Sequence, residues 1–328
     1  MTQVFNSRDQ LLSIKNLNVS FVQHNQTTAV LHGIDLDILK GESLGMVGES
    51  GCGKSVTWLA CLGLLGAKAI QKGSIVLSGQ ELLNADAEDI TKVRGKRIAM
   101  IFQDPTSCLN PSHRIGSQIC ESLALHRGLK GEAARMQAIR LLERVHIPNA
   151  SQRLRAYPHE LSGGMNQRVM IAMALAGEPE LLIADEPTTA LDATVQAQII
   201  DLLNEIRRDS GMTLVVISHD LGVISAIAER VVVMYAGRIV ETVATNALFS
   251  SAGHPYTLGL LAAIPTLDSK SDRLNTIQGS VPEPGKLTIG CSFSPRCNYA
   301  SDHCHHCTPA PVQIKPGHSV RCLNTPIQ

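Results

Sequence analysis

The stretch Gly48-Glu-Ser-Gly-Cys-Gly-Lys-Ser55 decides the fold of this chain. It fits the pattern G-x-x-x-x-G-K-[ST] of a phosphate-binding loop, in which glycines let backbone N–H groups come close to phosphate oxygens. The apolar run 44–47 before it predicts a buried strand, and residues 56–65 after it predict a helix. Bound phosphates would therefore lie at a helix N-terminus, where free N–H groups and the helix dipole favour anions.

The loop also predicts individual ligands. We expect Lys54 to reach the β- and γ-phosphate oxygens of ATP and Ser55 to bind Mg²⁺ through its hydroxyl. The rest of the loop would contribute nucleotide contacts: Gly48, Glu49, Ser50, Gly51, Cys52 and Gly53. A chance glycine-rich turn is the alternative, and the strand before the loop and the helix after it make that alternative weak.

A second motif, Leu181-Leu-Ile-Ala-Asp-Glu-Pro187, is an apolar run of strand length that ends in two acidic residues. Side chains at the carboxyl end of a buried strand project into the site crevice of an α/β sheet. We expect Asp185 to hold Mg²⁺ and Glu186 to polarise the attacking water as a general base. An acidic pair on the surface is the simpler alternative.

With Leu161-Ser-Gly-Gly-Met165, these motifs resemble those of ABC-transporter ATP-binding subunits, and the resemblance covers nearly the whole chain. It implies an α/β fold: a P-loop NTPase core of the ABC type with an antiparallel β subdomain and a helical subdomain. It also implies that Ser162, Gly163 and Gly164 contact the γ-phosphate of ATP held by a second ATPase subunit. Met165 stands where the family usually has Gln, a variant that the peptide-importer branch tolerates.

The resemblance assigns further residues to the site. Gln103, in Met100-Ile-Phe-Gln-Asp-Pro105, would sense Mg²⁺ and the attacking water, and its loop would meet the membrane subunit. His219 would contact the γ-phosphate. A lone Gln or His is most often an ordinary surface or core residue, but each of these follows an apolar strand-like run, 98–101 and 214–217. Both would therefore lie at strand ends beside the phosphate loop.

Two weaker assignments complete the nucleotide site. Phe21 follows the alternating stretch 14–19 and matches the aromatic residue that stacks on adenine in the family, although it could equally be a core aromatic at a strand end. Ala190-Leu-Asp192 matches the D-loop of the family.

Composition limits the class of protein. Lys and Arg total 29, as do Asp and Glu, so the formal net charge of the 328 residues is zero. This balance argues against a nucleic-acid partner bound by bulk electrostatics. No apolar stretch approaches the roughly 18–20 residues that span a bilayer, and residues 1–10 lack the apolar core of a signal peptide. We therefore expect separate subunits to form any membrane path.

The organisation along the chain predicts two domains. Residues 1–250 would form the ATPase domain, with a helical subdomain at about 108–164, where residues 132–145 place Ala138, Leu141, Leu142 and Val145 on one helix face. Residues 251–328 are rich in proline and predict a loop-rich extension. One phosphate loop and one signature indicate one nucleotide-binding unit per chain.

The extension contains five of the nine cysteines: Cys291, Cys297, Cys304, Cys307 and Cys322. The other four are scattered and fit small packing residues. A secreted disulfide framework conflicts with a cytosolic ATPase, whereas clustered thiolates suggest a metal. The spacing of Cys304 and Cys307, with three histidines nearby, is compatible with zinc, and spacing alone does not choose between zinc and iron–sulfur.

The resemblance narrows this choice. His254-Pro-Tyr-Thr257, Gly279-Ser-Val-Pro282 and Gly290-Cys-Ser-Phe-Ser-Pro-Arg-Cys297 are similar to the C-terminal extension of dipeptide/oligopeptide permease ATPases. In that branch a cysteine quartet can hold a 4Fe–4S cluster, and the quartet corresponds here to Cys291, Cys297, Cys304 and Cys322. Cys307 departs from the common pattern and is an alternative fourth ligand. Zinc or an empty thiol cluster stays open.

The resemblance implies the ATP-hydrolysing subunit of an importer for di- or oligopeptides, peripheral at the cytoplasmic face of the bacterial inner membrane. Its expected partners are a related second ATPase chain, two integral-membrane permease subunits and an extracytoplasmic solute-binding protein. Import of nickel chelates or another small solute is an alternative. A soluble non-transport ABC ATPase of nucleic-acid repair or translation is another, but such proteins usually carry two nucleotide-binding units per chain.

Overall fold

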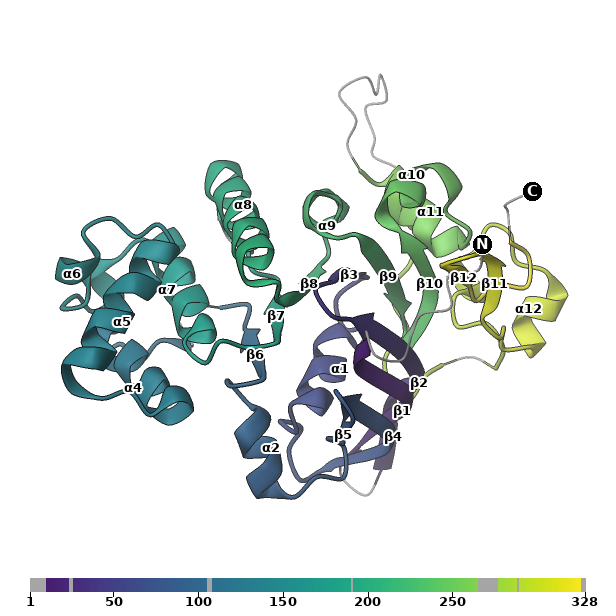
Figure 1. Ribbon diagram of the computed structural model, residues 1–328. Coiled ribbons are helices and arrows are strands. Elements are labelled where there is room, and N and C mark those ends of the chain that lie inside the picture. The colour runs from purple at the N-terminus through teal and green to yellow at the C-terminus, as the bar shows by residue number, and fades with distance from the viewer. Residues whose placement is uncertain are drawn as a thin grey trace. The chain divides into compact units, whose positions relative to one another are not determined.

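The computed structural model describes residues 10–23, 26–104, 108–189, 191–264, 277–287 and 289–325 (Figure 1). They divide into two units. The first comprises Met1–Leu39, Ser43–Asn84 and Ser218–Gln328, and the second comprises Lys40–Glu42 and Ala85–Ile217. The predictions on the polar start at residues 1–9 and on Ala190 of the D-loop lie outside the described residues.

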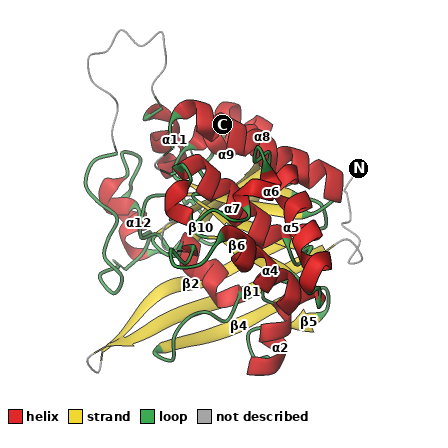
Figure 2. Ribbon diagram, turned by 90° about the vertical axis from the view of Figure 1, so that its left-hand side faces the viewer, coloured by secondary structure: helices red, strands yellow, loops and turns green. Residues whose placement is uncertain are grey.

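An antiparallel sheet in the first unit has the strand order β2-β1-β4-β5. Its strands are β1 (Gln10–Gln23), β2 (Gln26–Leu39), β4 (Ala69–Leu77) and β5 (Gln80–Glu81). Along β1 the side chains of Leu12, Ile14, Leu17 and Val19 are fully buried. Within each pair the spacing is the two residues of a strand face, and a register shift between Ile14 and Leu17 separates the pairs. The long strands β1, β2 and β4 lie side by side in Figure 2. The antiparallel β subdomain predicted from the resemblance is thus confirmed.

A second group of strands in the same unit follows the order β11-β12-β10-β9-β3. The buried strand β3 (Ser43–Val47) runs parallel to β9 (Arg230–Tyr235), and β10 (Arg238–Ala244) pairs antiparallel with β9. Helix α1 (Lys54–Cys61) follows β3, and α9 (Leu221–Ile227) precedes β9. Helix α1 starts two residues before the predicted 56–65 and ends earlier, because Gly63 takes a left-handed conformation (φ 59°) that terminates helices.

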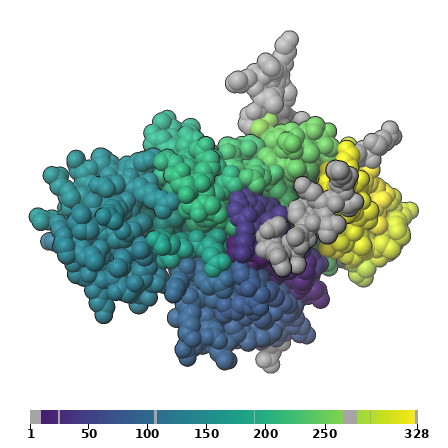
Figure 3. Space-filling view, in the orientation of Figure 1, coloured from purple at the N-terminus to yellow at the C-terminus, as the bar shows by residue number. Residues whose placement is uncertain are grey.

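The C-terminal tail packs against this sheet. It contains α10 (Thr245–Ser251), α11 (Pro255–Ala262), the 3₁₀ turn η2 (Ser294–Arg296), α12 (Asp302–His306), β11 (Val312–Lys315) and β12 (His318–Val320). Strand β12 pairs antiparallel with β10, so the loop-rich tail extends the sheet by two strands that the sequence did not predict. In Figure 3 the yellow tail lies directly against the green segment that carries β10 and α11.

The second unit contains three parallel strands in the order β8-β7-β6: β6 (Ile98–Ile101), β7 (Leu181–Asp185) and β8 (Thr213–Ser218). Its helical elements are α2 (Ala87–Val93), α4 (Ile115–Arg127), α5 (Gly131–Arg144), α6 (Ala150–Arg153), η1 (Pro158–Glu160), α7 (Gly163–Leu175) and α8 (Ala193–Ser210). Helix α5 buries Ala138, Leu141 and Leu142, the face that its periodicity predicts. No helix in the described part of the chain is long and apolar enough to cross a membrane.

Candidate nucleotide site and cysteine pocket

The phosphate loop joins the carboxyl end of β3 to the first turn of α1, as the sequence predicts. Two glycines make its path possible. A Cβ on Gly48 would lie 2.3 Å from the carbonyl oxygen of Met234, and Gly53 has a φ of 104°, which side chains rarely allow. The loop therefore passes close to neighbouring backbone and brings its N–H groups to the N-terminus of α1, an arrangement that fits a phosphate group.

Lys54 is buried, with 6% of its surface exposed. Its Nζ donates to the carbonyl oxygens of Gly48 at 2.6 Å and Glu49 at 3.1 Å, so the loop's first two residues set the position of the ammonium group. The Cys52 side chain is also buried, 3.8 Å from Lys54 Nζ, and burial raises the pKa of this thiol. Cys52 therefore stays protonated at neutral pH and faces the protein interior.

The acidic motif ends β7 in the second unit. Asp185 is the last residue of this fully buried strand, and Glu186 follows it with a φ of 48°, a left-handed conformation that is costly for a side-chain-bearing residue. Glu186 Oε2 accepts hydrogen bonds from Gln103 Nε2 at 2.9 Å and from Thr189 Oγ1 at 2.8 Å. Backbone strain at one residue, held by specific side chains, is typical of functional sites.

The Gln103–Glu186 contact follows from the sheet. Gln103 lies two residues after the end of β6, and β6 and β7 are parallel neighbours, so both strands end at the same edge. The structure thus brings together two residues that the resemblance assigned separately. Thr189 was not predicted, although its place three residues after Glu186 in a turn was available in the sequence as a signal.

The signature begins helix α7 of the second unit. Ser162 is the N-cap, and its Oγ accepts from the N–H of Met165 at 3.3 Å. Ser162 and Gly163 are exposed, whereas a Cβ on Gly164 would lie 2.8 Å from Val195 Cγ1. The free N–H groups of a helix N-terminus therefore point from an exposed turn, which suits an anion that comes from outside the chain.

The remaining predicted nucleotide residues belong to the first unit. Ser55 is half-buried in the first turn of α1. His219 is exposed directly after β8, the strand-end position that the sequence predicts. Phe21 is half-buried on β1, where it pairs with Thr28 of β2 and Ala69 of β4.

Four of the five tail cysteines line one small pocket of about 10 Å³: Cys291, Cys297, Cys304 and Cys322. The N–H of Cys291 donates to the carbonyl oxygen of Cys304 at 2.8 Å, which ties two of these segments together. Burial, and secondarily the neighbouring thiols, raises the pKa of Cys322 to about 11. Cys307 does not line this pocket.

This pocket fits a metal centre only in part. Its donor set, four thiols on one cavity, is the kind that soft metals and iron–sulfur clusters use. Yet across the described ranges no three His, Cys, Asp or Glu side chains are arranged so that they could hold a metal ion. His303, His305 and His306 of α12 are exposed and do not line the pocket.

Comparison with known proteins decides the family. The ABC transporter family model matches residues 31–189, and the model of the oligopeptide/dipeptide transporter C-terminal region matches residues 240–304. The oligopeptide transport ATP-binding protein AppD of Bacillus subtilis (strain 168) is 46% identical over 315 residues, which cover 95% of this chain and 96% of AppD. The chain belongs to the ATP-binding subunits of oligopeptide/dipeptide ABC transporters.

Solved structures support the same fold for this ABC subunit. The ATP-binding cassette MJ0796, in a dimer with ADP and Pi, is 27% identical with a TM-score of 0.64, and the match covers 72% of this chain and 99% of that one. CbiO1 from Clostridium perfringens, part of the transporter complex CbiONQ, is 28% identical with a TM-score of 0.64, covering 74% and 91%. The predicted P-loop NTPase cassette is therefore confirmed, as is membership of an ATP-hydrolysing family.

Proposed function

We propose that this ABC subunit binds and hydrolyses ATP to drive the import of di- or oligopeptides through separate membrane permease subunits. The observation that carries the proposal is the match to AppD along 95% of the chain, which includes both the cassette and the tail. The match of the tail to the oligopeptide/dipeptide transporter region favours peptides over nickel chelates as the solute.

ATP would be held by the phosphate loop, with Lys54 at the β- and γ-phosphates and Phe21 against adenine. Ser55, Asp185 and Gln103 would hold Mg²⁺, which would supply positive charge to the transferring phosphoryl group. Lys54 would exchange its contacts with the Gly48 and Glu49 carbonyls for phosphate oxygens, a small movement for a flexible side chain.

Glu186 would act as the general base for the attacking water, while His219 contacts the γ-phosphate. The hydrogen bonds from Gln103 and Thr189 both reach Glu186 Oε2, so they orient the carboxylate for this role. A carboxylate held at a strained backbone position is pre-organised and does not need to reorient in the reaction.

The exposure of Ser162 and Gly163 in the signature supports a proposal that the site is shared between two subunits. Ser162, Gly163 and Gly164 would contact the γ-phosphate of ATP on a second ATPase subunit, a related chain in a heterodimer. ATP binding would close this pair of subunits and hydrolysis would release it. The loop after Gln103 would pass the motion to two permease subunits at the cytoplasmic face of the inner membrane, which receive solute from an extracytoplasmic binding protein.

The test is Glu186→Gln in the purified complex with its membrane partners. We expect ATP turnover to fall by about 100-fold or more, because the amide does not accept the water's proton, while ATP still binds. Glu205→Gln, on the exposed face of α8, is the matched control and should retain full turnover. Undiminished ATPase activity in Glu186→Gln would refute the assignment of the base.

We further propose that the tail binds a 4Fe–4S cluster through Cys291, Cys297, Cys304 and Cys322. This is supported by the position of these four thiols on one pocket, which Cys307 does not line. The thiols must turn toward a common centre to bind it, and the cluster would brace the tail. Anaerobic purification with iron, sulfide and zinc analysis tests this: about four irons per chain supports the cluster, and one zinc in a colourless protein refutes it.

A further inference from the structure

The C-terminal tail holds the phosphate loop at one residue, Glu49. Arg296 Nη1 donates to both carboxylate oxygens of Glu49, at 2.9 and 3.2 Å. The hydroxyl of Tyr256 accepts from the N–H of Glu49 at 2.9 Å. Both tail residues lie more than 200 positions further along the chain, and they fix the side chain and the backbone of the same loop residue.

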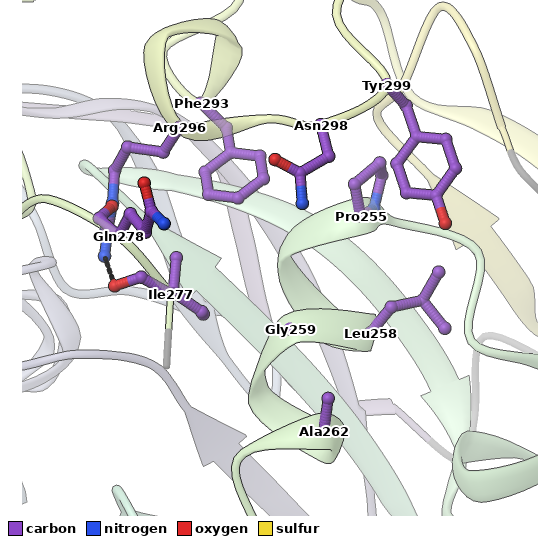
Figure 4. A pocket seen from close by; sticks show the side chains of 10 residues that line it. All are labelled: Pro255, Leu258, Gly259, Ala262, Ile277, Gln278, Phe293, Arg296, Asn298 and Tyr299. Atoms are coloured by element: carbon purple, nitrogen blue, oxygen red, sulfur yellow. Dashed lines mark hydrogen bonds between the residues drawn. The ribbon is translucent and has the colours of Figure 1, made fainter. Parts of the chain in front are cut away.

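Arg296 is itself held firmly. Its side chain is 7% exposed, and its Nε donates to the carbonyl oxygen of Gln278 at 2.8 Å. Its Nη2 lies 3.4 and 3.3 Å from the carbonyl oxygens of Ile277 and Gly279. Figure 4 shows Arg296 at one end of a pocket of about 340 Å³, beside Gln278. A planar guanidinium engaged on several edges cannot swing away, so its contact with Glu49 is fixed in direction.

Tyr256 is equally constrained. It is fully buried, and its ring lies 4.7 Å from that of Tyr235 and 5.4 Å from that of Phe293, measured between centroids. Its backbone N–H donates to His254 Nδ1 at 3.0 Å, which starts helix α11. The aromatic cluster therefore fixes the hydroxyl that meets Glu49.

These contacts explain three tail motifs that the nucleotide chemistry leaves unused. His254-Pro-Tyr-Thr257 supplies Tyr256, Gly279-Ser-Val-Pro282 supplies a carbonyl to Arg296, and Ser294-Pro-Arg-Cys297 supplies Arg296. All three therefore converge on Glu49, whose own carbonyl oxygen accepts from Lys54 Nζ.

We propose that Arg296 and Tyr256 are positioning residues for ATP binding, which set the loop backbone that in turn places Lys54. The inference rests on the proposed role of the phosphate loop. Since neither residue would touch the nucleotide, loss of either should weaken ATP affinity and leave the chemical step nearly intact. The tail then becomes part of the nucleotide site and not only a mark of the transporter branch.

The experiment uses the assembled transporter and measures ATP affinity by equilibrium binding, together with kcat and KM for ATP hydrolysis. We expect Arg296→Gln to weaken ATP affinity about fivefold or more with kcat within about twofold. Glu49→Gln should have a similar effect, and the double variant should be no weaker than the worse single one, because both remove one interaction. Tyr256→Phe, which removes only a hydroxyl, should weaken affinity without loss of folding.

Two further variants make the result decisive. Arg321→Gln is the matched control, since Arg321 donates to the carbonyl oxygens of Ile239 and Pro309 and should leave ATP affinity unchanged. Lys54→Ala tests the underlying role of the loop, and retained affinity in that variant would overturn the loop assignment itself. Unchanged affinity in Arg296→Gln and Tyr256→Phe, with affinity lost in Lys54→Ala, would overturn this inference alone.

Discussion

The phosphate loop is held by buried contacts with distant residues, whereas the signature turn is exposed and held by a local contact. In the loop, Lys54 is buried and Glu49 is held by two buried side chains of the tail. In the signature, Ser162 and Gly163 are exposed, and the cap bond of Ser162 is local, to Met165. The chain thus supports the phosphate loop from its own interior, whereas the signature turn lies at its surface. This difference is expected if the signature completes a site on another subunit.

Substitution of buried residues where the tail packs on the sheet should therefore lower the free energy of unfolding. The largest effect is expected at Glu241 of β10, whose side chain is fully buried. It accepts from the N–H groups of Gly253 and His254, at 2.7 and 3.0 Å, and contacts His318 Nε2 at 2.7 Å. Glu241→Ala leaves these buried donors without an acceptor and should lower the free energy of unfolding by about 3–5 kcal/mol.

Denaturant unfolding of the purified subunit measures this loss. Glu132→Ala is the control, because Glu132 is exposed on α5 and pairs only with nearby Arg135 among the contacts described for it, so its loss should cost less than about 0.5 kcal/mol. A cost below about 1 kcal/mol for Glu241→Ala would mean that the tail does not depend on this buried acid.

The strand ends that carry site residues could be predicted from the sequence, whereas the contacts of the tail could not. The ends of β6 and β7, with Gln103 and Glu186, were predictable because an apolar run followed by a polar residue reveals a strand end. The contact of Arg296 with Glu49 was not predictable, because the two residues are 247 positions apart. A single arginine in a proline-rich tail also gives no sign in the sequence that its side chain is buried. Strands as short as β11 and β12 have too few residues for a periodic pattern.

The next largest expected effect is a dependence of stability on pH that arises from His254. Burial lowers the pKa of His254 from 6.5 to about 4. Between these values the unfolded chain binds a proton that the folded chain does not, so stability is complete above pH 6.5 and falls as the pH decreases toward 4. The loss attributable to this residue reaches about 3 kcal/mol.

His254→Asn should flatten the dependence of unfolding free energy on pH in that window, because Asn can still cap α11 but does not titrate. An identical slope in His254→Asn and the unmodified protein would show that His254 is not the residue that titrates.

The smallest effect on stability is expected in the exposed region. Ser162→Ala removes the cap of α7 and should cost about 1 kcal/mol, whereas Ser162→Asn and Ser162→Asp both keep a good capping side chain. The last two variants have nearly the same shape and differ in charge. In isolated subunits we expect them to melt alike.

In the assembled transporter the two variants should separate. If Ser162 faces a γ-phosphate on the second subunit, the aspartate repels it, and turnover should fall about tenfold or more below that of Ser162→Asn. Equal turnover would mean that no phosphate approaches this turn. A difference in turnover without a difference in stability would show that the exposed half of the site gains its role only from a partner, whereas the buried half already has its shape within the chain.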